Sequence, residues 1–420
     1  MIAKGETFFF SHTPIWEETE PVLRGGRLGL LCNHAAWHPE TGEYLFETLF
    51  RWGVLKRVFL PEHGLFGELQ DQEKLEGEEL YVELGFSGCE FVSLYGQDES
   101  SLSAKSEKLT DLDALVLDIQ DVGSRYYTYF STMRNLFITL TKENIPLPVW
   151  IVDRENPAGP TVEGSRLKKE YASFIGIEGV PHRHGLSIGE MAGFLYAQTG
   201  AKFPLHVVSY NVGGKRVGAR FYPWTIPPSP NIPGFFTCDF YSGQCLWEGT
   251  NVSEGRGTTR PFEVFGAPWM EDLVAYNRKA GYKSWNDGYH PLFDPGAALR
   301  WQRFIPVFHK YSGECCFGFQ LIRRDGVYHA LIHALRIIRF LRENCEAFAF
   351  RPGKYETGND KTAIELLLGD SMLLSYIRGE GVGNEELPEF FRREEAAWIE
   401  EAREYRLYEE PLRSAAAFYK

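Results

Sequence analysis

An acid and a base stand side by side in the stretch Leu60-Pro61-Glu62-His63-Gly64. The apolar run from Val54 to Leu60 has the composition of a buried strand, and Pro61 ends it. In open α/β sheets the ligand crevice lies beyond the carboxyl ends of the strands. A carboxyl group and an imidazole at such a place could transfer protons, so Glu62 and His63 are candidate catalytic residues. The alternative interpretation is structural: Glu62 caps the next helix and His63 pairs with a neighbouring loop.

Further carboxylates could complete an acid–base pair. Glycoside cleavage needs one carboxyl group that is kept protonated and usually a second that acts as base or nucleophile. The candidates follow strands or lie in turns and loops, and they are Asp118, Asp121, Glu155, Glu163, Glu248 and Glu254. Their separations are not given by the sequence, so retaining and inverting chemistry both stay open.

Two histidines flank an arginine in His182-Arg183-His184. On a strand, side chains two residues apart point the same way, so this pair could bind a metal. The spacing and the intervening arginine match no zinc motif. We therefore favour contact of His184 with the substrate or with a substrate-binding residue, and a metal site formed with His63 is the alternative.

The first half of the chain contains the elements that must position these side chains. Five short apolar runs each end in polar residues: 27–32, 54–60, 91–95, 114–119 and 149–152. Runs without alternation suit parallel strands buried on both faces, and the stretches between them are long enough for helices. This pattern predicts a Rossmann-like, doubly wound, mainly parallel α/β sheet. We expect the polar residues after the strands to gather along one edge of the sheet, namely Asn33, Glu62, His63, Asp118, Asp121, Asp153 and Arg154.

No nucleotide-binding glycine run follows any of these strands, so we expect no nucleotide and no other cofactor. Ser187-Ile188-Gly189-Glu190 is a capping box that predicts a helix over 189–198 and a structural role for Glu190. Five prolines between Pro223 and Pro233 indicate a domain boundary. We place it so that a Rossmann-like domain covers 1–225 and a second domain covers 226–420.

The second half opens with a glycine-rich loop from Glu248 to Pro261. Such a loop could approach a ligand through its backbone, with Arg256 or Arg260 meeting an anion. The alternative is a tight loop between domains. Further along, 306–310 and 315–322 are predicted strands, and the apolar spacing over 328–346 predicts a helix.

Composition narrows the class of protein. With 420 residues, two domains are the default. A net charge of -13 argues against a nucleic-acid surface and against affinity for anionic lipid. No run approaches the roughly 18 apolar residues of a membrane span. The 7 scattered cysteines suit free thiols in a reducing compartment. With no segment typical of a signal peptide, these features predict a cytoplasmic monomer or homodimer that binds a small substrate.

Taken together, the motifs make the chain resemble the exo-β-N-acetylmuramidases, a bacterial family of glycoside hydrolases. The motifs are Pro61-Glu62-His63-Gly64, the stretch 118–129, Asp153-Arg154-Glu155-Asn156-Pro157, Val162-Glu163-Gly164, Arg183-His184-Gly185, Pro228-Ser229-Pro230-Asn231, Trp247-Glu248-Gly249-Thr250-Asn251, Gly255-Arg256-Gly257-Thr258 and Gly266-Ala267-Pro268-Trp269. The resemblance implies release of terminal β-1,4-linked N-acetylmuramic acid from the non-reducing end of peptidoglycan fragments. It also implies a Rossmann-like domain, a smaller α/β domain and an active-site cleft between them.

The resemblance implies that Glu62 is the catalytic acid, and we take Glu163 as the second carboxylate. His63 or Asp121 would tune the pKa of Glu62. The lactyl carboxylate of the sugar would be held by one of Arg125, Arg183 and Arg256. The other expected substrate contacts are Asn33, Tyr126, Arg154, His184, Asn231, Glu248, Asn251 and Thr258.

Two other functions use the same residues. A non-catalytic protein could bind muropeptides in the same cleft without turnover. A metal-dependent hydrolase could use His63, His182 and His184. The expected intracellular location would give the muramidase a role in cell-wall recycling.

Overall fold

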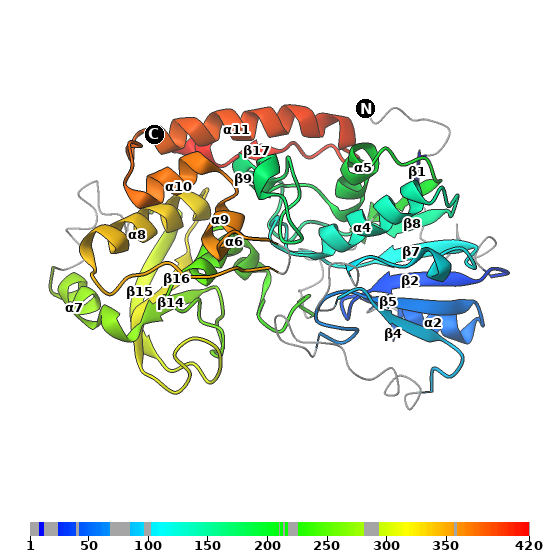
Figure 1. Ribbon diagram of the computed structural model, residues 1–420, viewed down its shortest axis with the longest axis horizontal. Helices are drawn as coiled ribbons and strands as arrows, with labels where there is room; N and C mark the ends of the chain where they lie inside the picture. Colours follow the sequence, from blue (N-terminus) through cyan, green and yellow to red (C-terminus); the bar gives the residue numbers. More distant parts are fainter. Residues whose placement is uncertain are drawn as a thin grey trace.

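The protein is described here from a computed structural model. The described residues are 8–11, 24–38, 42–67, 85–95, 102–209, 211–212, 215–216, 226–280, 294–356 and 359–419. Figure 1 shows two lobes side by side, one built from the blue-to-green part of the chain and the other from the green-to-red part.

The first lobe is organised around a parallel sheet that has seven strands within the described residues. Their order is β1 (Phe8–Ser11), β11 (Leu205–Val208), β8 (Val149–Val152), β7 (Ala114–Asp118), β2 (Leu28–Cys32), β5 (Leu55–Leu60) and β6 (Glu90–Ser93). Every neighbouring pair is parallel. The five predicted strands and the α/β fold class are confirmed. The central strands β2 and β7 are buried along their whole length, which explains their unalternating apolar sequences.

Helices α2 (Leu45–Arg51), α4 (Tyr129–Lys142) and α5 (Ile188–Gln198) pack around this sheet. The capping box of α5 is confirmed: the Ser187 hydroxyl accepts from the Glu190 amide, and the Glu190 carboxylate accepts from the Ser187 amide at 3.0 Å. Glu190 is therefore structural, as expected. The short strand pairs β3 (Trp37–His38) with β4 (Glu43–Tyr44), and β12 (Asn211–Val212) with β13 (Lys215–Arg216), lie outside the main sheet.

The second lobe contains an antiparallel sheet ordered β14 (Val264–Ala267), β16 (Cys316–Arg323) and β15 (Ala297–Phe304). Its helices are α6 (Phe235–Gln244), α7 (Glu271–Ala280), α8 (Ala330–Asn344), α9 (Ala363–Leu368) and α10 (Ser371–Arg378). The prediction of a strand over 306–310 is wrong. His309 has a φ of 67°, and the Val307 amide donates to Gly257, so this segment turns against the glycine-rich loop.

The end of the chain returns to the first lobe. Helix α11 (Glu386–Ala402) runs along both lobes in Figure 1, and β17 (Arg413–Ser414) pairs in parallel with β9 (Thr161–Arg166). Strand β9 also pairs with β10 (Pro181–Arg183). One continuous hydrophobic core includes side chains from both lobes. The predicted boundary at 225/226 adjoins residues 217–225, which lie outside the described residues, and it stays a prediction.

Candidate active site

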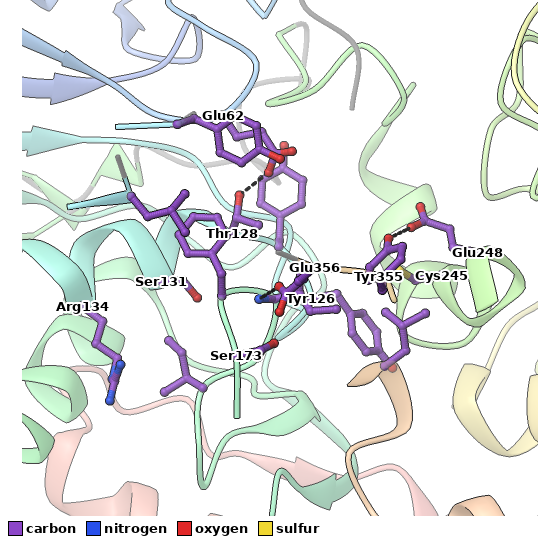
Figure 2. Close-up of a pocket in the computed structure, with 18 of the residues that line it drawn as sticks. Glu62, Tyr126, Thr128, Ser131, Arg134, Ser173, Cys245, Glu248, Tyr355 and Glu356 are labelled. Carbon is purple, nitrogen blue, oxygen red and sulfur yellow. Dashed lines mark hydrogen bonds between the residues drawn. The ribbon is translucent and has the colours of Figure 1, made fainter. Parts of the chain in front are cut away.

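A cavity of about 900 Å³ lies where the two lobes meet. The first lobe lines it with Glu62, His63 and the segment 126–128, among others, and the second lobe with Glu248, Arg256, Tyr355 and Glu356. Figure 2 shows Glu62, Tyr126, Thr128, Glu248, Tyr355 and Glu356 around the opening. The cavity is large enough for a sugar and part of its aglycone, and its walls carry both acidic and aromatic groups.

Glu62 is held at the end of β5 by the turn that Pro61 begins. Its side chain is 6% exposed, and its carboxylate accepts a 2.6 Å hydrogen bond from the Thr128 hydroxyl. Thr128 immediately precedes α4, so the strand end and the helix start fix the carboxylate together. The structural alternative, in which Glu62 caps the next helix, is not what is seen, because the carboxylate binds the side-chain hydroxyl of Thr128.

His63 lines the cavity beside Glu62 and adopts a left-handed backbone with φ of 72°. Gly64 follows with φ of 80°, so two successive residues turn through a region that side chains disfavour. A non-glycine residue in this region costs on the order of 1 kcal/mol or more and is frequent at functional sites. The turn places the imidazole and the carboxylate on the same cavity.

The opposite wall is an ion-paired cluster from the second lobe. Glu248 accepts from the Arg256 guanidinium at 2.8 Å and from the Tyr355 hydroxyl at 2.6 Å. Arg256 also lies 3.6 Å from Glu254 and stacks over Phe262, with 5.0 Å between the guanidinium carbon and the ring centroid. The sequence predicts that the glycine-rich loop can approach a ligand through its backbone. In the structure it contributes the side chains of Glu248 and Arg256 to the cavity wall.

Glu254 is fully buried beneath this wall. It pairs with Lys310 at 3.0 Å and with His309 at 2.8 Å. Burial opposes its ionisation, but Lys310 and the other cations outweigh burial and lower the pKa of Glu254 well below its usual range. Glu254 therefore supports Arg256 from behind with a permanent negative charge.

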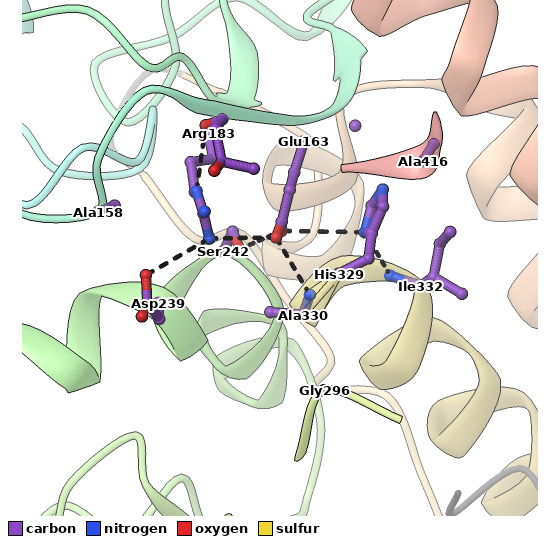
Figure 3. Close-up of polar contacts among 12 residues, drawn as sticks. Ala158, Glu163, Arg183, Asp239, Ser242, Gly296, His329, Ala330, Ile332 and Ala416 are labelled. Carbon is purple, nitrogen blue, oxygen red and sulfur yellow. Dashed lines mark hydrogen bonds and ion pairs between the residues drawn. The ribbon is translucent and has the colours of Figure 1, made fainter. Parts of the chain in front are cut away.

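Glu163 lies away from the cavity, in the polar network of Figure 3. It is fully buried and accepts from Arg183 at 3.2 Å, from the Ser242 hydroxyl at 2.6 Å and from the Ala330 amide at 3.3 Å. Ser242 and Ala330 belong to α6 and α8 of the second lobe. The carboxylate thus joins the two lobes, and the structure does not bring it together with Glu62.

Asp121 is also buried and does not line the cavity. One carboxyl oxygen accepts from the Gly123 amide at 2.7 Å, and no hydrogen bond is found for the other. Burial raises the pKa of Asp121 to about 8, against the opposing effect of the Gly123 and Val122 amides. The group is therefore protonated in the folded protein near neutral pH.

We expect Asp121 to make the protein less stable as pH rises from about 4 to about 8. Between its ordinary pKa and its raised one, the unfolded chain has lost the proton and the folded chain retains it, so the free energy of unfolding falls as pH rises. Asp121→Asn removes this titration. Urea unfolding should show the variant gaining about 3.5 kcal/mol relative to wild type between pH 5 and pH 8, since a one-proton difference contributes about 1.4 kcal/mol per pH unit. Parallel pH profiles for the two proteins would contradict the assignment.

The expected substrate residues Arg125 and Arg183 have internal partners. Arg125 donates to backbone carbonyls of Ser165, Val180, Leu367 and Leu368, at 2.7 to 3.2 Å. Arg183 is occupied by Glu163 and by the Thr161 carbonyl. Neither lines the cavity.

The three histidines of the proposed metal site do not converge. His182 contacts Arg125 at 2.9 Å, and burial with this nearby cation lowers its pKa well below the usual range. In His184, Nδ1 accepts from the Leu186 amide, and burial lowers the pKa to about 3. Among the described residues, no three histidine, cysteine or acidic side chains are grouped so that they could hold a metal. The metal-dependent alternative is therefore not supported.

Of the polar residues after the strands, Glu62 and His63 line the cavity, whereas the others bind neighbouring protein groups. Asp118 pairs with Arg154 at 2.7 Å and with His38 at 3.2 Å. Burial opposes ionisation of Asp118, but Arg154 outweighs it and lowers the pKa to about 2. The Asn33 side chain donates to the Gln120 carbonyl at 3.2 Å, which joins the segments that follow the neighbouring strands β2 and β7, where the strand order reverses.

The remaining predicted contacts hold loops or line the cavity wall. The Asn231 amide donates to Ser229, the Thr258 hydroxyl to the Gly255 carbonyl, and the Asn251 side chain to the Ala347 carbonyl. None of these three lines the cavity. Tyr126 does line it, while its hydroxyl donates to the Ser242 carbonyl at 3.0 Å.

Comparison with known proteins identifies the family. Models of the N-terminal and C-terminal parts of "Exo-beta-N-acetylmuramidase NamZ" match residues 28–235 and 240–408. The chain belongs to the NamZ exo-β-N-acetylmuramidase family. It is 33% identical over 328 residues to the peptidoglycan β-N-acetylmuramidase NamZ of Bacillus subtilis (strain 168), covering 76% of this chain and 74% of the relative.

Two crystal structures of DUF1343 family proteins from Bacteroides fragilis share the NamZ fold of this chain. Both are 24% identical and cover 94% of it, with TM-scores of 0.73 and 0.65. The matches cover 97% and 98% of the two solved chains, so the likeness extends over both lobes.

Many cavity residues of this NamZ family member were not among the predicted site residues, and Thr128, Tyr355 and Glu356 are three examples. Thr128 lies within the polar stretch after Asp118, so its hydroxyl could have been included with that motif. Tyr355 and Glu356 follow a segment with no regular spacing, where no local pattern indicates a site. They reach the cavity only because the lobes meet there.

Within the described residues, no helix is long and apolar enough to cross a membrane.

Proposed function

We propose that the chain is a β-N-acetylmuramidase that releases terminal N-acetylmuramic acid from the non-reducing end of peptidoglycan fragments. The observation that carries the proposal is the position of Glu62. In a member of the NamZ family, this carboxyl group lies at the meeting of both lobes, inside a cavity of sugar size. The Bacillus subtilis relative is named for peptidoglycan β-N-acetylmuramidase activity.

In this proposal Glu62 is the general acid. It protonates the glycosidic oxygen as the bond to the anomeric carbon breaks, which removes the need to expel an alkoxide. The hydrogen bond from Thr128 fixes the carboxyl group, and one wall of the cavity is formed by His63 next to it. Enclosure of Glu62 at 6% exposure limits its access to bulk water.

Recognition of the lactyl carboxylate falls to Arg256 in the same proposal. Of the three arginines considered from the sequence, Arg256 lines the cavity, whereas Arg125 and Arg183 do not. Arg134 also lines the cavity, on the side away from Glu248 in Figure 2. Arginine suits a carboxylate because its guanidinium can donate two parallel hydrogen bonds.

We also propose a cytoplasmic role in cell-wall recycling. All seven cysteines lie in the described residues and all are free thiols, which suits a reducing compartment. Burial raises the pKa of the Cys32 and Cys238 thiols well above the usual range, so these two are protected from oxidation.

The test is hydrolysis of a chromogenic N-acetylmuramic acid β-glycoside beside the matching N-acetylglucosamine β-glycoside. The proposal expects turnover of the first substrate and a strong preference for it over the second. Binding of the muramic compound without release of the chromophore would instead favour a non-catalytic muropeptide-binding protein. Equal turnover of both would remove the assignment to muramic acid.

A further inference from the structure

A second carboxylate reaches the cavity from the other lobe. Glu356 lies between α8 and α9, whereas Glu62 follows β5 of the first lobe. Both side chains line the same cavity, and Figure 2 shows Glu62 in its upper part with Glu356 below it. The Glu62 charge acts on the Glu356 carboxyl group, so the two are near enough to interact electrostatically.

The structure also fixes how Glu356 is held. Its Oε1 atom accepts a 2.9 Å hydrogen bond from the Ile175 amide of the first lobe. Burial raises the pKa of Glu356, and Glu62 adds to this direction, while the Ser173 hydroxyl and nearby amides oppose it. A carboxylate with a raised pKa binds a proton more readily, which is the property that a general base needs.

The other acidic groups considered for this role are otherwise engaged. Both oxygens of Glu248 accept hydrogen bonds, from Arg256 and from Tyr355. Glu163 and Asp121 are buried outside the cavity lining. Glu178 lines the cavity, but its side chain is exposed, so solvent screens its charge.

We propose that Glu356 is the general base of the reaction, activating the water that attacks the anomeric carbon. This inference rests on the proposed glycosidase function. Glu356 takes one proton from water while the water oxygen bonds to the anomeric carbon. The bond from that carbon to the glycosidic oxygen breaks, and Glu62 supplies the proton to the leaving oxygen. The sugar leaves with an inverted anomeric configuration, and solvent returns Glu356 and Glu62 to their starting proton states.

The test makes Glu356→Gln and Glu62→Gln in the 420-residue chain and compares their activities on two substrates. One is a β-1,4-linked N-acetylmuramic acid–N-acetylglucosamine disaccharide, and the other is a 4-nitrophenyl N-acetylmuramic acid β-glycoside, whose leaving group needs little protonation. We expect Glu356→Gln to lose about 10³-fold in kcat/KM on both substrates, because water activation is needed for each. Glu62→Gln should lose far more on the disaccharide than on the aryl glycoside.

Asp360→Asn is the matched control, because it removes a carboxylate four residues away whose side chain is 87% exposed and does not line the cavity. It should stay within about twofold of wild type, as is usual for a surface change. Glu356→Gln retains an oxygen for the Ile175 amide, so its thermal midpoint should stay close to that of wild type. NMR of the first product formed by wild type should show inversion.

Three results would overturn the role of Glu356. They are near-normal activity of Glu356→Gln on both substrates, loss on the disaccharide alone, and retention of anomeric configuration by wild type. The sugar assignment is tested separately. If wild type cleaves only N-acetylglucosamine glycosides, the muramic acid proposal is wrong. The same variants then test the role of Glu356 on the N-acetylglucosamine substrate. Wild type that cleaves neither sugar removes both proposals.

Discussion

Replacing Glu62 by glutamine should lower kcat/KM on a muramic acid disaccharide by about 10³-fold, the range usual for loss of a general acid. Glutamine keeps the size of the side chain and an oxygen that can accept the 2.6 Å hydrogen bond from Thr128. It has no acidic proton for the leaving sugar. The loss should therefore fall mainly on kcat, with little change in substrate affinity.

The leaving group separates this explanation from general damage to the site. A 4-nitrophenolate leaves without protonation, so Glu62→Gln should lose only about tenfold on the aryl glycoside. Glu346→Gln makes the same chemical change at an exposed position and should behave like wild type. Activity of Glu62→Gln on the disaccharide near the wild-type value would remove Glu62 from the acid role.

Replacing Arg256 by leucine should abolish most of the preference for muramic acid over N-acetylglucosamine. The two sugars differ by the lactyl ether. In the proposal, its carboxylate accepts hydrogen bonds from the Arg256 guanidinium. A charge-assisted hydrogen bond contributes about 1.5–3 kcal/mol, so kcat/KM for the muramic substrate should fall roughly 10- to 100-fold. The rate on the N-acetylglucosamine substrate should change much less, and the ratio of the two values is the measurement.

Arg256→Lys is the conservative control, since lysine keeps the charge but cannot donate two parallel hydrogen bonds. It should retain an intermediate preference. Arg256 also neutralises Glu248 at 2.8 Å, so thermal unfolding must be recorded for each variant. If Arg134→Leu erases the preference and Arg256→Leu does not, the lactyl carboxylate lies at the Arg134 end of the cavity.

The sheet was predictable because each central strand carries its own signal. β2, β7 and β8 are short apolar runs, and burial on both faces requires such sequences. The capping box of α5 is equally local, since Ser187 and Glu190 satisfy each other's backbone amides. The turn containing Glu62 and His63 could be recognised for the same reason: its strand, proline and glycines are consecutive.

The partners of the polar side chains could not be predicted in this way. Arg125 donates to the Leu368 carbonyl, 243 positions away in the sequence, and nothing near Arg125 indicates that carbonyl. The residues next to Glu163 in the sequence are compatible with a catalytic carboxylate. Its hydrogen-bond partners, however, come from the distant helices α6 and α8. Charge and motif identify groups that need partners, and only the assembled lobes decide whether the partner is substrate or protein.

The returning C-terminal segment limits how this enzyme could be divided or recombined. Glu395 of α11 accepts from the Gly164 amide at 2.9 Å and from His329 at 2.8 Å, so one side chain fastens both lobes. Trp398 donates to the His184 carbonyl at 2.9 Å. A first lobe expressed alone would lack the strand that pairs with β9 and would expose the surface beneath α11. A chimaera that exchanges lobes between relatives would therefore have to take residues 386–419 from the same parent as the first lobe, although they follow the second lobe in the sequence.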